Sequence, residues 1–176
     1  MERWIRKALE AGFDEAAELD CAHLVARPEV RAACSTNSCR RYGTSWSCPP
    51  GCGTLEECAA RLRGYSKGLI VQTVGQLEDE FDGEGMMEAA ERHARTFRRL
   101  AAELRREFPG MLPMGTGSCS RCDSCTYPDA PCRDPFGASP PMEAYGILVA
   151  DACRASGIPY YHGKGTITYT ACFLLQ

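Results

Sequence analysis

The sequence predicts an α/β fold: a single small domain in which a sheet with flanking helices carries two cysteine-rich loops. Segments of helical apolar periodicity alternate with β-branched runs, which is typical of this class. The length of 176 residues, with 44% hydrophobic and 24% charged residues, suits one globular domain. The 12 cysteines gather mainly in two stretches without periodicity. We therefore expect residues 1–176 to form one domain.

The first half of the chain contains one predicted helix and one clear strand. Residues 3–11 have apolar side chains at helical spacing, and Gly12 is a typical helix stop. Residues 14–26 are ambiguous, and their last part, residues 23–26, is a possible strand closed by Pro28. The β-branched run of residues 68–74 predicts a strand buried on both faces.

The second half alternates further helices and strands. Apolar residues at i, i+3, i+4 and i+7 predict a long helix over residues 86–104, followed by a short strand within residues 111–116. Prolines at its start and a glycine at its end predict a helix over residues 140–157. Residues 159–161 and 166–175 are expected to be strands joined as a hairpin.

Charge and hydropathy exclude several partners. The net charge of −3 gives no electrostatic footprint for nucleic acid, and the basic stretch of residues 92–106 is interleaved with Glu103 and Glu107, as on a solvated helix face. No apolar run approaches the roughly 18 residues that a membrane span needs. The first residues are charged and lack a signal-peptide pattern, so we expect a cytoplasmic protein. Because disulfides are rare in the cytosol, the cysteines are better explained as metal ligands.

The second cysteine loop carries the strongest motif. Cys119, Cys122 and Cys125 have the spacing C-x2-C-x2-C, and Cys132 follows on a returning stretch. Thiolates at this spacing can hold three corners of a [4Fe–4S] cluster, and a fourth thiolate completes it. The alternative is a structural zinc site on the same four cysteines, although zinc more often uses two separate C-x2-C turns.

The first cysteine loop supplies five thiols, from Cys34, Cys39, Cys48, Cys52 and Cys58, at spacings that match no standard metal signature. The first three can hold three corners of a second cluster, with Cys52 or Cys58 as the fourth ligand. If neither reaches the metal, one iron stays open to water or substrate, as in catalytic centres. That difference separates an electron carrier from an enzyme, and no catalytic residue is assigned.

The two loops and a later segment resemble a family of predicted metal-binding proteins, the domain of unknown function 2284, found mostly in anaerobic bacteria and archaea. The resemblance spans roughly residues 20–175 and implies metal or iron–sulfur binding without assigning a reaction. It is carried by these residues: Val30, Arg31, Cys34, Cys39, Tyr42, Gly43, Trp46, Cys48, Pro49 and Pro50; Gly117, Cys119, Cys122, Cys125, Thr126, Tyr127, Pro128, Pro131, Cys132, Arg133 and Pro135; and Pro141 to Ile147. The implied ligands are Cys34, Cys39, Cys48, Cys119, Cys122, Cys125 and Cys132.

Several other candidates have simpler interpretations. Cys153 and Cys172 lie in an apolar helix face and a strand, where they are expected to be buried small hydrophobes. His93 borders an apolar helical stripe and is expected to pack there, and His162 lies in a predicted turn. Glu143 is expected near a helix start, where a carboxylate is favoured.

The sequence thus predicts an iron–sulfur protein with up to two [4Fe–4S] clusters. It would perform electron transfer, or redox or sulfur chemistry at an open iron, with a redox partner protein. Two alternatives remain open: a zinc-stabilised structural or interaction module without chemistry of its own, and a metal carrier.

Overall fold

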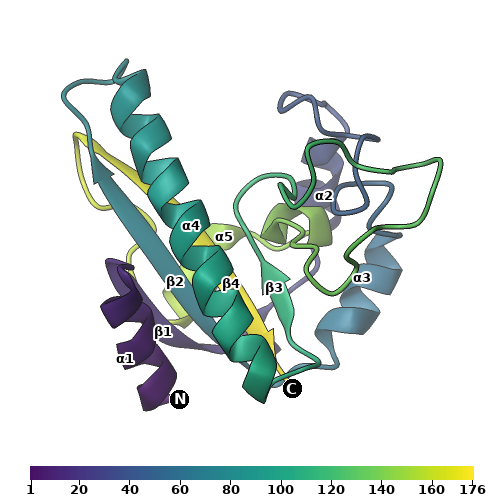
Figure 1. The fold of residues 1–176 in the computed structure, drawn as a ribbon, viewed down its shortest axis with the longest axis horizontal. Coiled ribbons are helices and arrows are strands. Elements are labelled where there is room, and N and C mark those ends of the chain that lie inside the picture. The colour runs from purple at the N-terminus through teal and green to yellow at the C-terminus, as the bar shows by residue number, and fades with distance from the viewer.

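A four-stranded antiparallel sheet forms the middle of the fold, with helices on both faces (Figure 1). The strands are β1 (Glu15–Asp20), β2 (Lys67–Gln76), β3 (Leu112–Met114) and β4 (Thr166–Leu175), in the order β1-β2-β4-β3. This computed structural model describes all residues from 1 to 176. The predicted α/β class is confirmed.

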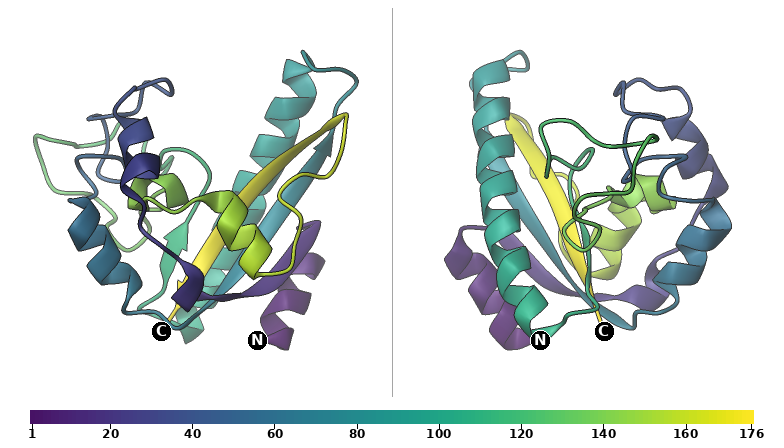
Figure 2. Two further views of the ribbon diagram at one scale, coloured as in Figure 1. Left: turned by 180° about the vertical axis from the view of Figure 1, so that it is seen from behind. Right: turned by 45° about the vertical axis from the view of Figure 1, so that its right-hand side comes forward.

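The helices divide between the two faces of the sheet (Figure 2). Helices α1 (Glu2–Ala11) and α4 (Gly83–Glu107) cover one face. The other face carries α3 (Leu55–Leu62), α5 (Val149–Ala155) and the 3-10 turn η2 (Met142–Tyr145), and α2 (Pro28–Cys34) packs on η2. A further 3-10 turn, η1 (Cys21–His23), follows β1. Both cysteine loops lie on this second side.

The side chains of the central strand β2 point alternately into two hydrophobic cores, one on each face of the sheet. Leu69 and Val71 point into the core beneath α1 and α4, whereas Ile70 points into the core beneath the cysteine side. All three are completely buried, as predicted for this run, because successive side chains of a strand face opposite sides. On β4, Phe173 and Cys172 divide between the two cores in the same way.

The first helix, the long helix and the strands β2, β3 and β4 are confirmed close to their predicted positions. Helix α4 begins where the Asp82 carboxylate accepts a hydrogen bond from the Gly85 N–H across 2.8 Å, and it ends before Pro109. Helix α1 ends at Gly12, whose φ of 109° is readily adopted only by glycine.

The structure corrects the prediction of an irregular stretch between Cys34 and Cys58. Helix α3 begins inside it, where Thr54 and Glu57 form a reciprocal capping box with distances of 2.8 and 3.2 Å. Pro28 was expected to close a strand but instead begins α2. Residues 23–26 form no strand, because the chain has already left the sheet at Asp20, whose carboxylate caps η1.

The predicted helix over residues 140–157 is wrong as a single element. Gly146, with φ 76°, separates η2 from α5, and its carbonyl oxygen accepts a hydrogen bond from the Arg27 N–H across 2.8 Å. The expected strand at residues 159–161 is also wrong, since β4 is already paired with β2 and β3 on its two edges. None of the helices is long and apolar enough to cross a membrane.

Candidate metal centre

The four cysteines of the second loop surround one small cavity. Cys119, Cys122, Cys125 and Cys132 all line it, together with Trp46 and neighbouring residues of the first loop. The thiols of Cys119, Cys122 and Cys132 are half-buried and Cys125 is exposed. The fold therefore brings together the complete predicted ligand set of this loop, at a place where the centre would lie near the surface.

The two cysteine loops lie side by side and are joined by hydrogen bonds (Figures 1 and 2). The indole N–H of Trp46 donates to the carbonyl oxygen of Ala130 across 3.0 Å, and the Trp46 ring meets Tyr127 edge-on, with centroids 4.9 Å apart. The backbone N–H of Cys119 donates to the buried Ser47 hydroxyl across 3.0 Å. The first loop therefore helps to position the thiols of the second.

Side chains also fix the second loop internally. The Arg133 guanidinium donates to the Ser124 carbonyl oxygen across 2.7 Å, and the Thr126 hydroxyl donates to that of Pro131 across 2.8 Å. Arg121 pairs with Asp134 across 2.5 Å and keeps the pKa of that carboxyl below its usual value. These contacts tie the stretch that carries Cys125 to the returning stretch that carries Cys132.

The environment of Cys125 favours a thiolate. Desolvation raises the pKa of this thiol, but the backbone N–H groups of Tyr127, Trp46 and Thr126 and the Ser45 hydroxyl outweigh it, so the pKa is lowered. Hydrogen bonds to the charged form of a thiol stabilise that form. The same donors from both loops are suited to a metal-bound sulfur, whose negative charge they compensate.

The first loop divides into two groups of thiols. Cys34, Cys39 and Cys48 form one group: burial raises the pKa of Cys34, Arg31 opposes this effect, and Cys48 and Cys39 raise the pKa further. Cys48 is buried, Cys34 is half-buried and Cys39 is exposed. The Cys34 thiol also lies 4.0 Å from the carbonyl oxygen of Glu143, so η2 borders this group.

Cys52 and Cys58 form the second group of thiols. The Nη1 of Arg31 lies 3.3 Å from the Cys52 Sγ and 3.6 Å from the Cys58 Sγ, so one guanidinium contacts both sulfurs. The hydrogen bond from Cys52, with Arg31 and Arg61, lowers the pKa of Cys58 to about 6, while the same bond raises the pKa of Cys52. The pair therefore favours one thiolate and one thiol.

The side chains are not arranged around a single metal ion. No three His, Cys, Asp or Glu side chains form a group that could hold one. The four cysteines of the second loop nevertheless line one cavity.

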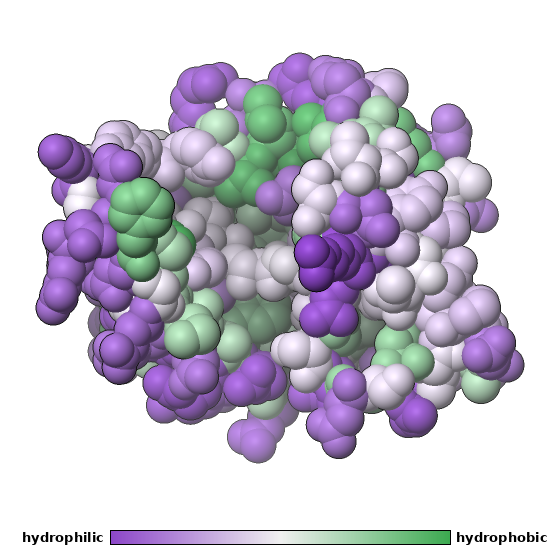
Figure 3. All heavy atoms as spheres, turned by 90° about the horizontal axis from the view of Figure 1, so that it is seen from above, coloured by the Kyte–Doolittle hydropathy of each residue, from purple (hydrophilic) through white to green (hydrophobic).

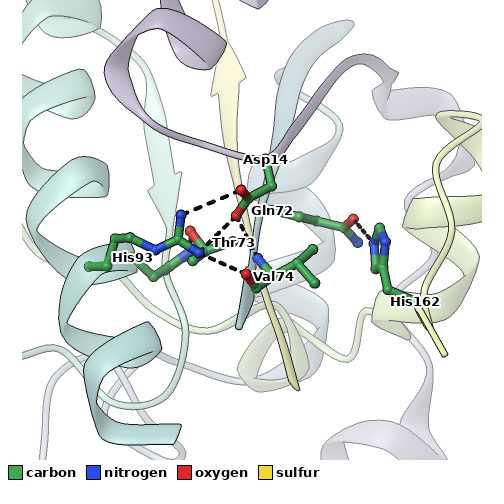
Figure 4. Close-up of polar contacts among 7 residues, drawn as sticks. Asp14, Gln72, Thr73, Val74, His93 and His162 are labelled. Atoms are coloured by element: carbon green, nitrogen blue, oxygen red, sulfur yellow. Dashed lines mark hydrogen bonds and ion pairs between the residues drawn. The ribbon is translucent and has the colours of Figure 1, made fainter. Parts of the chain in front are cut away.

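The cysteines outside the two loops are buried in the core, and two of the histidines are hydrogen-bonded to side chains of β2. Cys21, Cys153 and Cys172 are buried in the core on the cysteine side. His93 is only 1% exposed, and its Nδ1 is hydrogen-bonded to the Thr73 hydroxyl across 2.9 Å (Figure 4). In the same close-up, Nε2 of His162 is hydrogen-bonded to the Gln72 side chain across 3.0 Å, on the opposite side of β2.

Sequence reasoning missed two cavities beside the loops, because each is lined by residues far apart in the chain. One, of about 330 Å³, lies between α4 and the second loop and is bordered by Arg98, Arg105 and Arg121. The other, of about 540 Å³, lies between the two loops and is lined by Cys52 and Cys132, among others. Seen from above, the molecule is hollowed between the α4 side and the cysteine-loop side (Figure 3).

Comparison with known proteins identifies one family. A family model described as "Predicted metal-binding protein (DUF2284)" matches residues 17–175. The match covers both cysteine loops, the whole sheet except the first two residues of β1, and every helix except α1. Neither the curated proteins nor the solved structures contain a match.

Proposed function

Because the chain belongs to this family of predicted metal-binding proteins, we propose that Cys119, Cys122, Cys125 and Cys132 hold a [4Fe–4S] cluster that serves in electron transfer. The observation that carries the proposal is the cavity that all four thiols line. When bound, such a cluster supplies one-electron redox chemistry.

The spacing of the cysteines favours an iron–sulfur cluster over a single zinc ion. All four donors are thiols, a set that both iron–sulfur clusters and zinc accept. The C-x2-C-x2-C run of Cys119, Cys122 and Cys125 is typical of a cluster, whereas zinc more often uses two separate C-x2-C turns. All four cysteines line one cavity, which suits a shared centre.

The surroundings of the site suit a redox centre that exchanges electrons with another protein. The N–H and O–H donors around Cys125 compensate negative charge on a ligating sulfur. Cys125 lies at the surface, and Phe136, which follows the second loop, is 76% exposed. An exposed aromatic side chain four residues after Cys132 is suited to contact with a redox partner protein.

A second cluster on the first loop is supported by the family match, which covers Cys34, Cys39 and Cys48. We propose these three thiolates as its ligands, which leaves one position of that cluster without a cysteine from this group. We place the protein in the cytoplasm, where thiols stay reduced and can bind metal.

Substitution of single cysteines tests the proposal. Cys122→Ser removes one ligand of the second loop, so the anaerobically purified variant should lose the iron and acid-labile sulfide of that centre. Cys153→Ser is the matched control, because Cys153 is a buried thiol of the core and should leave both contents unchanged. Equal metal content in the Cys122→Ser variant and the parent protein would contradict the assignment.

Metal analysis and a chelation experiment separate the alternative functions. A zinc-stabilised module predicts that Cys122→Ser loses zinc and that the parent protein contains no sulfide. A metal carrier predicts that a chelator removes the metal rapidly from the folded parent protein, whereas a resident cluster should stay bound on that time scale.

A further inference from the structure

Cys52 and Cys58 form a buried thiol pair that is distinct from the ligands proposed above. Cys52 is 5% exposed and Cys58 is fully buried in the second turn of α3. The capping box at Thr54 fixes the start of this helix. The Cys58 thiol donates to the carbonyl oxygen of Cys52 across 3.6 Å, and the Nη1 of Arg31 contacts both sulfurs. The two sulfurs are thus brought to one guanidinium nitrogen.

Arg31 is the cation that faces both sulfurs. Besides the contacts of its Nη1 with Cys52 and Cys58, its guanidinium donates hydrogen bonds to the carbonyl oxygens of Ala144 and Gly53. A fixed positive charge beside a thiol pair favours the loss of one proton from the pair. Because Arg31 keeps its two carbonyl partners, it remains hydrogen-bonded when the sulfurs carry no charge.

A route from solvent reaches the pair at Cys52. The cavity of about 540 Å³ between the cysteine loops is lined by Cys52, Arg61 and Tyr145. The Arg61 guanidinium donates to the Cys52 carbonyl oxygen across 2.8 Å and to the Tyr145 hydroxyl across 3.2 Å, so this wall of the cavity is ordered. Of the two cysteines, Cys52 lines this cavity and Cys58 does not.

We propose that Cys52 and Cys58 are a redox-active dithiol, which a low-molecular-weight disulfide oxidises to an intramolecular disulfide. The inference does not depend on a bound metal. It assigns these two thiols to a modification site in place of the fourth-ligand role that their sequence positions suggest.

The reaction is ordinary thiol–disulfide exchange. Cys52 passes its proton to the Cys58 thiolate, and its sulfur attacks the oxidant RSSR, giving a mixed disulfide at Cys52 and releasing RS⁻. The Cys58 thiol then gives its proton to RS⁻, and its sulfur attacks the Cys52 sulfur and displaces the second RS⁻. Two electrons leave the pair, one S–S bond is exchanged for another, and RSH and RS⁻ are the products.

The experiment uses the full chain with its metal, exposed anaerobically to increasing ratios of oxidised to reduced glutathione. Samples are quenched in acid and alkylated, and their fragments are mapped by mass spectrometry. Trypsin leaves Cys48, Cys52 and Cys58 together between Arg41 and Arg61, and a second cut after Glu56 or Glu57 separates Cys58 from the other two. The expected product is a pair of fragments that stay joined after both cuts and in which Cys48 is alkylated, which identifies a Cys52–Cys58 link, formed while the iron content is unchanged.

Cys58→Ser should abolish this link, whereas Cys21→Ala, a control whose thiol is also 5% exposed, should leave it intact. If a variant does not fold, the fragment map of the oxidised parent protein still shows which cysteines are linked. A link between Cys48 and Cys52, or two alkylated thiols at this pair when other thiols are oxidised, would overturn the proposal. Loss of iron in Cys52→Ser and Cys58→Ser equal to that in Cys122→Ser would show that the pair ligates metal.

Discussion

Trp46 and Ala130 join the two cysteine loops: the indole N–H of the first loop donates to a carbonyl oxygen of the second across 3.0 Å. The same ring packs edge-on against Tyr127, two residues after Cys125. The first loop also contributes donors to Cys119 and Cys125. The thiols of the second loop are therefore positioned by both loops, and the two loops form one structural unit.

Trp46→Phe removes this hydrogen bond and retains an aromatic ring beside Tyr127. We expect the free energy of unfolding to fall by about 1 kcal/mol, the usual contribution of one hydrogen bond. We also expect faster proteolytic cleavage within both cysteine loops, because their mutual contact is weakened. Urea titration and limited proteolysis of the metal-loaded protein measure these effects.

Trp4→Phe is the matched control. Its indole N–H donates to the Glu107 carboxylate across 3.3 Å, far from the loops in the core beneath α1 and α4. A comparable loss of stability with unchanged cleavage of the loops is expected for this variant. Unchanged cleavage in Trp46→Phe as well would contradict the joining role of Trp46.

His93 makes stability depend on pH. Burial, with a smaller effect of Arg92, lowers the pKa of His93 to about 4, against 6.5 for the ordinary side chain. Between these values the unfolded chain binds more protons than the folded one, so the stability that neutral His93 contributes is present above pH 6.5 and is lost as the pH falls to 4. The loss amounts to about 3 kcal/mol at full effect.

His93→Gln tests this dependence, because glutamine keeps a hydrogen-bonding group near Thr73 but does not titrate. The free energy of unfolding is measured by urea titration at several pH values from 7 to 4 for the parent and the variant. The parent should lose more stability than the variant on acidification. Loss of the metal at low pH lowers the stability of both proteins alike, so it does not affect the difference between them. Parallel curves would contradict the assignment of a neutral, buried His93.

Gly146 is placed where no other residue fits. Its φ is 76°, and a Cβ at this position would lie 2.8 Å from the backbone N and O atoms of Arg27. Gly146→Ala should therefore lower the free energy of unfolding by about 2–4 kcal/mol, because alanine is strained in the left-handed conformation and its Cβ clashes with the backbone of Arg27. Thermal unfolding of the variant measures this cost.

Gly157→Ala separates the two contributions, because Gly157 has a similar φ of 71° but nothing within 4 Å of its Cβ position. Only the conformational cost, about 1–2 kcal/mol, is expected there. If the two alanine variants are equally stable, the close approach between Gly146 and Arg27 does not contribute.

Local patterns predicted those elements whose signals lie within the element. The periodicity of α4, the β-branched run of β2 and the Gly12 stop all act over a few residues, and the structure agrees with each. The capping box of Thr54 and Glu57 was equally local and predicts α3, but the density of cysteines around it suggested an irregular loop. The break at Gly146 depends on Arg27, over a hundred residues earlier, which no local pattern contains.

In the candidate site, too, the features carried by local spacing were predicted and those that depend on packing were not. The C-x2-C-x2-C spacing of Cys119, Cys122 and Cys125 already predicted a common centre, and these thiols do line one cavity. The pairing of Cys52 with Cys58 and the position of Arg31 between their sulfurs arise from packing of α2 and η2 near α3. Spacing alone therefore left the role of these two cysteines undecided.

The most direct test is to quantify iron, acid-labile sulfide and zinc on one anaerobically purified sample, with absorption spectra before and after dithionite. The account predicts about four iron and four sulfide per chain for the second loop, about eight of each if the first loop also holds a cluster, and a broad visible band that bleaches on reduction. Stoichiometric zinc without sulfide under strict anaerobiosis would contradict the iron–sulfur assignment and leave a structural metal site.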